Sequence, residues 1–361
     1  MNKLTIIING IRFLLIVDNK KLFMEQEKVL SQYVLPSAEP TSETITIYYT
    51  KNSDLFNSTD ISLTKQELET LDTYKNEKHF KGTYQKYTAF QKDNKEYYVL
   101  SSPKSLNEFT LIGNPHIDTS IFPIRLMREI LIRKMEEKGI IFSHATGVTV
   151  NNEGMLLINN SGGGKTTLMT KFFESNENVG LLSNDRVFAT ANENTYSMNY
   201  FPFPILYSMG TVRGNENIKN YFIKTKQVEK ATNGKSTLKT YNKKIEIPLT
   251  DMKNIYPSIS LLTKSKIGRV IIPKLQLSNK DKKFVCISKL EPSEAYDILS
   301  QNTFTPNDTE VQRKPWLYPR KLSNLELSNL ANKTNKFLLK KSITLLEYGP
   351  DASSKEIISK L

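Results

Sequence analysis

The first 115 residues alternate between short apolar runs and turn residues, which is typical of β-structure. Runs rich in β-branched and aromatic residues predict strands at 4–8, 11–17, 44–49, 85–91, 95–101 and 108–112. Asn9-Gly10 separates the first two runs and Asp93-Asn94 separates the fourth from the fifth, so both pairs are predicted to be hairpins. Leu68 and Leu71 have helical spacing and predict a helix within Asp60–Tyr74. The pattern favours a β-rich N-terminal module with few helices.

From residue 116 onward, helical and strand patterns alternate. Pro123 opens an amphipathic helix that is predicted to end at Gly139. Apolar runs then predict strands at 140–143, 148–150, 155–158 and 179–183, and the chain closes with strand Ser342–Tyr348, a turn and a short helix at Ser353–Leu361. We therefore expect a mixed α/β (α+β) protein with two parts, residues 1–115 and 116–361.

A glycine-rich segment lies between the apolar run 155–158 and an amphipathic helix predicted over 165–173. It reads Asn159-Asn160-Ser161-Gly162-Gly163-Gly164-Lys165-Thr166-Thr167. Consecutive glycines let backbone N–H groups face inward, and the helix directs its positive dipole end at the same point, so the segment is suited to phosphate. Residues 160–167 are thus expected to bind a nucleotide, with Lys165 reaching the β- and γ-phosphates and Thr166 ligating Mg²⁺.

The segment departs from the phosphate-loop consensus at its first position, where Asn159 stands for glycine. Asparagine is among the few residues that tolerate left-handed backbone angles, so we expect the loop to form.

Two further polar residues have spacings that direct them toward this loop. Asp185 follows Lys165 by twenty positions, enough for a helix and a return strand, and Asn184 precedes it. The Asp185 carboxylate is expected beside the γ-phosphate, where it can bind Mg²⁺ or accept the proton of an attacking hydroxyl. His144 precedes Lys165 by twenty-one positions and follows another predicted strand. A structural, hydrogen-bonded role for His144 and a purely metal-binding role for Asp185 remain open.

Composition places few limits on these assignments. The chain has 361 residues, 38% hydrophobic and 24% charged, as expected of a globular protein of about two domains. Its single cysteine, Cys286, lies in an apolar run predicted to be a buried strand, and excludes an internal disulfide framework. Arg12 and Asn9-Gly10 interrupt the apolar N-terminus, so we expect a cytoplasmic protein with no signal peptide and no membrane span.

The net charge of +13 is concentrated in one stretch. Residues 213–289 hold 18 Lys and Arg against 5 Asp and Glu. Such a stretch can attract an anionic partner, although scattered lysines also form ordinary solvated surface. Nucleic acid is not expected, because no aromatic-interleaved basic motif is present. Arg186, Arg213, Lys235 and Lys244 are candidates to neutralise transition-state charge, and 231–237 is a candidate mobile loop.

Three segments together resemble the catalytic domain of HPr kinase/phosphorylase and its stand-alone relatives, including lasso-peptide precursor kinases. They are His144-Ala145-Thr146-Gly147-Val148, Ser161–Thr166 and Leu181–Val187, supported by the helix at 124–138 and the ending Tyr348-Gly349-Pro350-Asp351. The likeness is specific over residues 123–190 and does not extend to 1–115.

The resemblance implies a phosphoenolpyruvate-carboxykinase-like P-loop domain that uses ATP and Mg²⁺ to phosphorylate a serine or threonine hydroxyl of a peptide or small protein. It implies that Asp185 is the general base, that Thr166, Asn184 and Asp185 lie at the metal, and that His144 supports the transferred phosphate. A homo-oligomer is compatible with the family. Asn184 replaces the first Asp of the family's Asp-Asp pair, which puts metal affinity and reverse phosphorolysis in doubt.

Two other functions are compatible with the same residues. One is phosphorylation of a small hydroxylated metabolite. The other is a nucleotide-binding partner protein with little catalysis, in which Asn184 marks lost activity and the β-rich module recruits partners.

Overall fold

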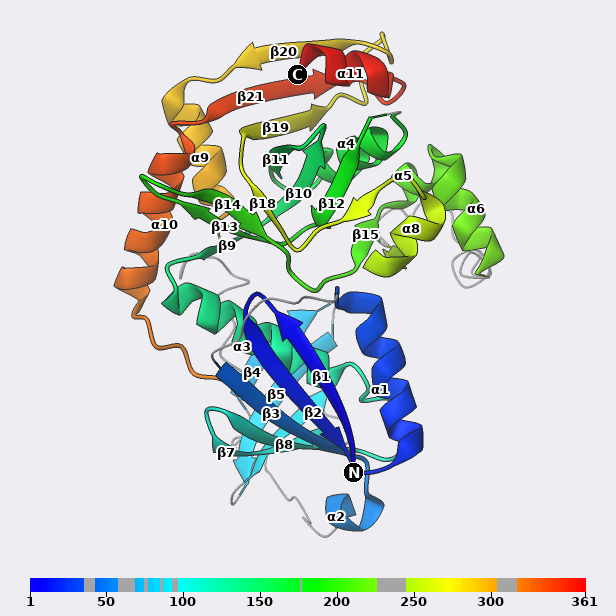
Figure 1. Ribbon diagram of the computed structural model, residues 1–361, viewed down its shortest axis with the longest axis vertical. Helices are drawn as coiled ribbons and strands as arrows, with labels where there is room; N and C mark the ends of the chain where they lie inside the picture. Colours follow the sequence, from blue (N-terminus) through cyan, green and yellow to red (C-terminus); the bar gives the residue numbers. More distant parts are fainter. Residues whose placement is uncertain are drawn as a thin grey trace. The chain divides into compact units, whose positions relative to one another are not determined.

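The computed structural model describes residues 1–35, 43–57, 69–74, 77–84, 87–92, 97–175, 177–225, 245–303 and 317–361. They form a mixed α/β protein with several sheets and two compact units (Figure 1). Unit 1 is Met1–Lys138 with the described part of Thr305–Asn324, and unit 2 is Gly139–Phe304 with Leu325–Leu361. The division lies after the helix that was expected to begin the second part, because that helix contacts the sheet of unit 1.

Unit 1 is built on one mixed sheet, with the strand order β1-β2-β3-β8-β7-β6-β5-β4 among its described residues. Its strands are β1 Asn2–Ile8, β2 Ile11–Val17, β3 Glu43–Thr50, β4 Glu69–Tyr74, β5 Glu77–Tyr84, β6 Tyr87–Lys92, β7 Tyr97–Ser105 and β8 Glu108–Gly113, and its helices are α1 Lys20–Tyr33, α2 Ser53–Asn57 and α3 Phe122–Glu137. All six predicted strands are present. The two predicted hairpins are confirmed as the antiparallel pairs β1–β2 and β6–β7, although the turn between the latter lies outside the described residues.

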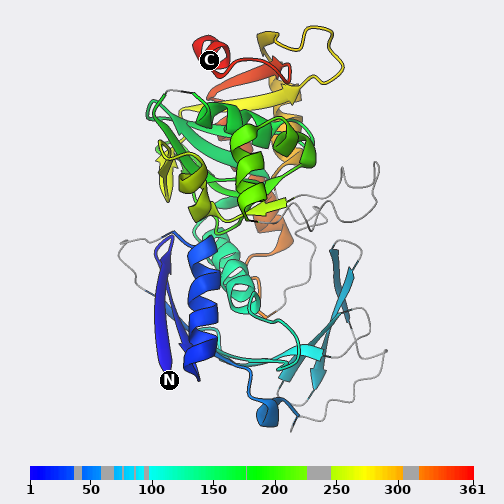
Figure 2. The same cartoon turned by 90° about the vertical axis from the view of Figure 1, so that its right-hand side faces the viewer.

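Two elements of unit 1 differ from the sequence prediction. Residues 69–74, expected in a helix, form strand β4, because they pair with β5 along an antiparallel ladder; the rest of the expected helix lies outside the described residues. Helix α1 was not predicted. Asn19 caps its first turn by accepting from Leu22 N (2.8 Å), and Leu22, Gln26 and Leu30 are buried. Figure 2 shows α1 lying along β1 and β2.

Unit 2 contains a seven-stranded sheet of order β17-β12-β10-β11-β19-β21-β20 and a four-stranded sheet of order β18-β14-β13-β9. Its strands are β9 Ile141–Ser143, β10 Ala145–Val150, β11 Glu153–Ile158, β12 Val179–Ser183, β13 Val187–Ala191, β14 Tyr196–Asn199, β15 Ile205–Tyr207, β16 Ile245–Ile247, β17 Ser260–Leu261, β18 Lys264–Lys266, β19 Arg269–Leu275, β20 Val285–Lys289 and β21 Ser342–Tyr348. Its helices are α4 Lys165–Phe173, α5 Met209–Arg213, α6 Glu216–Lys224, α8 Met252–Ile255, α9 Pro292–Gln301, α10 Asn324–Leu338 and α11 Ser354–Lys360. The predicted closing strand, turn and helix of the chain are confirmed.

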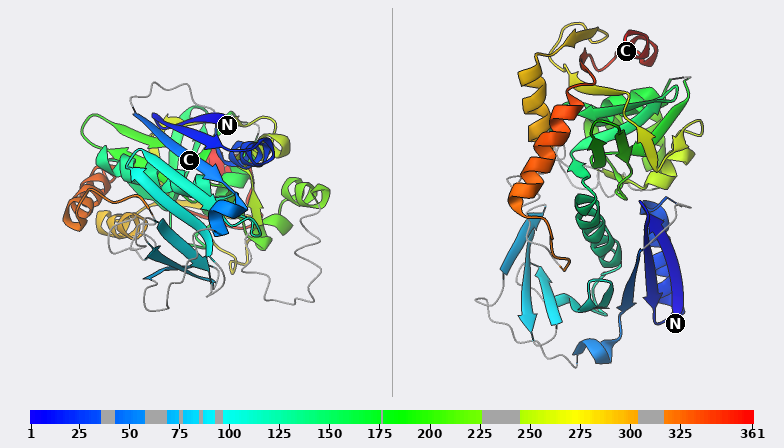
Figure 3. Two further views of the ribbon diagram at one scale, coloured as in Figure 1. Left: turned by 90° about the horizontal axis from the view of Figure 1, so that it is seen from below. Right: turned by 60° about the vertical axis from the view of Figure 1, so that its left-hand side comes forward.

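The centre of the larger sheet is fully buried because it is covered on both faces. All six residues of β10 and all five of β12 are buried, and Leu168, Met169 and Phe172 of α4 are completely so. Helices α9 and α10 run side by side in both Figure 1 and Figure 3. Cys286 is in a strand as predicted, but it is exposed, because β20 is the edge strand of its sheet. Within the described chain, none of the helices has the length and apolar character needed to cross a membrane.

Strand β10 lies between β11 and β12 and runs antiparallel to both. The β10–β11 turn consists of Asn151 and Asn152, both with positive φ (50° and 66°), which are the backbone angles of a two-residue hairpin loop. Because of these directions, the beginning of β10 meets the ends of β11 and β12 at one edge of the sheet. His144, the phosphate loop and Asn184-Asp185 all leave from that edge.

Gly154 permits the close approach of two chain segments at the start of β11. A Cβ built at this position would lie 1.8 Å from the backbone oxygen of Lys266, which cannot rotate away. We expect Gly154→Ala to lower the free energy of unfolding by about 2 kcal/mol or more, the range of core overpacking. Gly210→Ala is the matched control, because the nearest atom to its added Cβ is 3.8 Å away. Urea unfolding of both variants measures the difference, and equal stability would contradict the packing described.

Candidate functional site

The glycine-rich segment forms a loop between β11 and α4, as predicted. Gly162 and Gly164 have φ of 86° and 96°, a backbone conformation that residues with a side chain rarely adopt. Gly164 is also the N-cap of α4, and its carbonyl accepts a hydrogen bond from Tyr348 Oη at 2.8 Å. Burial raises the pKa of the Tyr348 phenol, so this group remains a protonated donor. Strand β21 thus supports the start of the helix from behind.

Asn159 is accommodated for a different reason from the one the sequence suggested. Its φ is not positive. Instead, its Nδ2 donates to Pro273 O (2.7 Å) and its Oδ1 accepts from Asn160 N (2.7 Å). The side chain lies against Gly163, where a Cβ would be 2.6 Å from Nδ2. The asparagine therefore anchors the loop to β19, and Gly163 is needed for contact with it.

The loop offers backbone donors to a ligand. The amides of Ser161, Gly162 and Gly164 have no acceptor among the described residues, and a Cβ added at Gly162 would meet no atom within 4 Å. No side chain caps the first turn of α4. Unpaired N–H groups at a helix N-terminus carry the positive end of the helix dipole, so this concavity favours an anion.

Lys165 turns back over the loop. It is 7% exposed, and its Nζ donates to Asn159 O and, at 3.4 Å, to Asn160 O. Its Nζ is also 3.4 Å from His144 Nε2. The ammonium group therefore already lies where an anion held by the loop amides would be placed.

Asn184 is buried and faces two threonines. Its Oδ1 accepts from Thr146 Oγ1 (2.9 Å) and Thr166 Oγ1 (3.3 Å), and its Nδ2 is buried with no hydrogen-bond partner among the described residues. The side chain is 1% exposed. Asn184 therefore orients the Thr166 hydroxyl, which was the first of the expected metal ligands.

Asp185 and His144 contact each other directly. His144 Nε2 lies 3.1 Å from Asp185 Oδ1, while Arg186 Nη1 donates to Asp185 Oδ2 at 2.8 Å. Asp185 has a φ of 66°, an uncommon backbone conformation for a residue other than glycine. Such strain is concentrated at functional sites, where the surrounding contacts enforce it. Here Arg186 and His144 hold the carboxylate in place.

Asp185 was expected at the end of the strand that neighbours the loop strand, and His144 at the end of another strand of the same sheet; both expectations are wrong in detail. Strand β12, which ends two residues before Asp185, does not neighbour the loop strand β11, since β10 lies between them. His144 does not follow a strand of the same sheet, since β9 belongs to the four-stranded sheet and His144 immediately precedes β10. The expected proximity is nevertheless confirmed, because the antiparallel direction of β10 brings its beginning to the same edge.

Of the candidate cations, the structure brings Arg186 to the site. Arg213 is in α5, but its side chain is not among those described, and Lys235, Lys244 and the loop 231–237 lie outside the described residues. Ser208, the N-cap of α5, contacts the hydroxyl of Thr211. Thr211 Oγ1 in turn lies 3.3 Å from Thr167 Oγ1. The beginning of α5 therefore borders the loop.

The end of α9 forms a wall of the site that sequence reasoning missed. Asn302 Nδ2 donates to Asn160 Oδ1 (2.9 Å), Gln301 Oε1 accepts from Asn160 Nδ2 (3.1 Å), and His144 N donates to Asn302 O (2.8 Å). Asn302 is 1% exposed. It joins the loop to the start of β10, and nothing in the local sequence Ser300–Thr303 signals that role.

The chain matches no known family model and no curated protein. Among the described residues, no three His, Cys, Asp or Glu side chains form a group that could hold a metal by themselves. The assignment of the site therefore depends on its own geometry and on the residues that carry the family resemblance.

The Asn302 contacts predict a specific defect. We expect Asn302→Ala to weaken Mg²⁺–ATP binding at least severalfold, because Asn160 loses one of its two side-chain anchors. The measurement is isothermal titration with Mg²⁺–ATP. Asn254→Ala, at an exposed position of α8, is the control. Unchanged affinity in Asn302→Ala would show that Asn302 does not position the loop.

Proposed function

We propose that the protein is an ATP-dependent kinase that transfers a phosphoryl group to a serine or threonine hydroxyl of a peptide or small protein. One observation carries the proposal. A continuous set of contacts runs from Lys165 Nζ to His144 Nε2 (3.4 Å) and on to Asp185 Oδ1 (3.1 Å). The Lys165 ammonium and the Asp185 carboxylate thus both contact one histidine, which supports a role for the first in binding phosphate and for the second as a base.

The residues present fit a nucleotide with Mg²⁺. The amides of Ser161, Gly162 and Gly164 and the start of α4 would hold phosphate oxygens, with Lys165 adding its charge. Thr166 and Asp185 supply the oxygen ligands that Mg²⁺ prefers. Asn184 acts in this proposal as the residue that orients Thr166, and it is too buried to be an open ligand.

Mg²⁺–ATP, when bound, supplies the phosphoryl group and a divalent charge. The chain's own residues position the acceptor. Asp185 accepts the proton of the acceptor hydroxyl on a carboxylate oxygen, while Arg186 and His144 keep that carboxylate oriented. Phosphoryl transfer depends mainly on positioning and charge neutralisation, so a modest base is sufficient.

The resemblance to HPr kinases and the edge-of-sheet position of the loop support a phosphoenolpyruvate-carboxykinase-like P-loop domain for unit 2. On the same basis we propose a cytoplasmic enzyme that acts on a biosynthetic precursor peptide or another small protein, not on nucleic acid. Whether copies assemble into an oligomer is a separate proposal drawn from the family alone.

One observation favours a second candidate, a nucleotide-binding protein with little catalysis. Asn184 brings no negative charge to the metal position, and its amide oxygen already accepts hydrogen bonds from Thr146 and Thr166. No observation specifically favours a kinase of small metabolites on the same scaffold. The transfer assay below tests that function as well.

We expect Lys165→Ala to abolish detectable phosphoryl transfer and weaken nucleotide binding. We expect Asp185→Asn to bind Mg²⁺–ATP but lower transfer at least about 10²-fold, the usual contribution of a general base. The measurement uses γ-labelled ATP with Mg²⁺ and offers candidate peptides alongside small alcohols. Lys253→Ala, at an exposed site on α8, is the control. Label found only in a small alcohol would reject the peptide acceptor, and full transfer by Asp185→Asn would remove its assignment as base.

Asn184→Asp tests the metal position without an activity assay. A buried carboxylate costs desolvation energy, so we expect the variant to lose roughly 1–3 kcal/mol of unfolding free energy in the absence of Mg²⁺. Mg²⁺ with a non-hydrolysable ATP analogue should return most of that loss, because the cation offsets the new charge. Asn254→Asp, which is exposed, should show neither effect. An equal response of Asn184→Asp and the parent protein to Mg²⁺ would place the metal elsewhere.

A further inference from the structure

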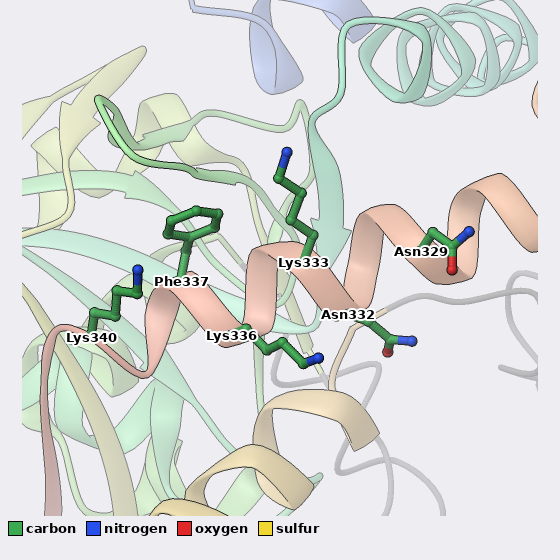
Figure 4. Close-up of a pocket in the computed structure, with 6 residues that line it drawn as sticks. All are labelled: Asn329, Asn332, Lys333, Lys336, Phe337 and Lys340. Atoms are coloured by element: carbon green, nitrogen blue, oxygen red, sulfur yellow. The ribbon is translucent and has the colours of Figure 1, made fainter.

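Helix α10 and the turn that follows it present a row of positive charges to solvent. Lys333 and Lys336 of α10 and Lys340, which lies just past the end of the helix at Leu338, are exposed and follow one another at intervals of three and four residues. With Asn329, Asn332 and Phe337 they line an open depression of about 520 Å³ (Figure 4). We call these six residues the α10 lysine face.

The described part of the chain does not balance the charges on this face. Among the described residues, no carboxylate lies within ion-pair distance of Lys333, Lys336 or Lys340, whereas Lys134, Lys219, Lys321 and Lys360 each pair with a glutamate. Like charges three and four positions apart on a helix repel each other. An anionic partner would relieve that repulsion, so the face is electrostatically complementary to negative charge.

A comparable depression on α1 shows that the imbalance is not a general property of lysine-rich helices. Its lining includes Lys20, Lys21 and Lys28, but also Glu25 and Glu27. The acidic residues neutralise most of that surface. On α10 the lining has no acidic member.

The other side chains of the face suit a peptide. Phe337 is half-buried and lies beneath Lys340, whose Nζ is 4.5 Å from the ring centroid. In Figure 4, Lys333 and Phe337 extend to one side of the helix and Asn332 and Lys336 to the other. A single aromatic ring with flanking amides can receive an apolar side chain and backbone groups. Single-stranded nucleic acid is bound instead by successive aromatic rings on which its bases stack.

The buried side of the same helix connects to the phosphate loop. Asn335 Oδ1 accepts from Thr303 Oγ1 at 3.0 Å, and the neighbouring Asn302 donates to Asn160 at 2.9 Å. Two consecutive residues thus link α10 to the loop. A chain docked on the α10 lysine face is held on an element that is linked to the site through Thr303 and Asn302.

We propose that the α10 lysine face docks an acidic segment of the acceptor peptide or protein, which rests on the kinase function proposed above. The segment carries Asp or Glu side chains opposite the three lysines and an apolar residue over Phe337. Docking raises the local concentration of the acceptor hydroxyl and leaves the chemistry to Asp185 and Lys165.

Binding of a fluorescein-labelled oligoglutamate peptide containing one phenylalanine tests this surface, with fluorescence anisotropy as the measurement. The charge-reversed variant K333E/K336E/K340E should bind at least tenfold more weakly than the parent. The matched variant K20E/K21E/K28E, with the same change in net charge, should stay within about twofold of the parent. Added salt should weaken peptide binding by the parent protein, because dissolved ions screen the attraction between charges. The Debye length at 0.1 M ionic strength is about 10 Å. A glutamine version of the peptide should not bind.

Equal binding by the parent and K333E/K336E/K340E would overturn the proposal, as would equal loss in both triple variants. Binding of a single-stranded DNA oligomer of the same charge as tightly as the peptide would reassign the face to nucleic acid. Lys165→Ala separates the two proposals, because it should keep peptide binding while losing transfer. Peptide binding at α10 with no transfer by the parent protein would refute the kinase and leave the docking surface standing. Transfer to an acidic peptide at the same kcat/KM in K333E/K336E/K340E would refute the docking surface alone.

Discussion

Which parts of unit 2 meet at the site depends on the pairing of β10 with β12 and on the tight turn at Asn151-Asn152. Because this turn reverses the chain in two residues, β10 must run against β11, and the same β10 pairs antiparallel with β12. The start of one strand and the ends of two others consequently share one edge. A histidine, a glycine-rich loop and a carboxylate that are far apart along the chain become neighbours there. The site is therefore a consequence of strand direction rather than of any single long-range contact.

The site holds its charged groups in a network that a ligand has to rearrange. Lys165 donates hydrogen bonds to carbonyl oxygens of its own loop. One carboxylate oxygen of Asp185 contacts Arg186 and the other contacts His144. An ammonium group bound to neutral carbonyls gains more from phosphate oxygens, because charge-assisted hydrogen bonds are roughly twice as strong as neutral ones. Nucleotide binding would thus exchange weaker contacts of Lys165 for stronger ones. The hydrogen bonds of Asn302 to Asn160 and of Tyr348 to Gly164 anchor the loop on either side of the glycines.

Local patterns were sufficient to predict the loop, its flanking elements and the strands β9 to β12, but not helix α9 or strands β13 to β19. The loop and its flanking strand and helix follow from glycine spacing and apolar runs. The spacings of His144 and Asp185 predicted that both lie near the loop, but not that they contact each other. Residues 69–74 were predicted wrongly because Leu68 and Leu71 share a spacing with helices, while pairing with β5 determines the strand. The hydrogen bonds by which Asn302 and Tyr348 hold the loop could not be predicted, because each residue lies more than a hundred positions away from the loop in the sequence. Asn159 was predicted only in part. The loop forms with asparagine at this position as expected, but the reason is the hydrogen bonds of its side chain and not a left-handed backbone conformation.

The most direct test of the site is a crystal structure with Mg²⁺ and a non-hydrolysable ATP analogue. We predict that the triphosphate lies on the amides of Ser161, Gly162 and Gly164, and that Lys165 Nζ leaves Asn159 O and Asn160 O for phosphate oxygens. Asp185 should then lie beside the terminal phosphate, with Thr166 at the metal. Nucleotide bound away from the loop, or a Lys165 that still contacts its own loop carbonyls with the triphosphate in place, would contradict the account.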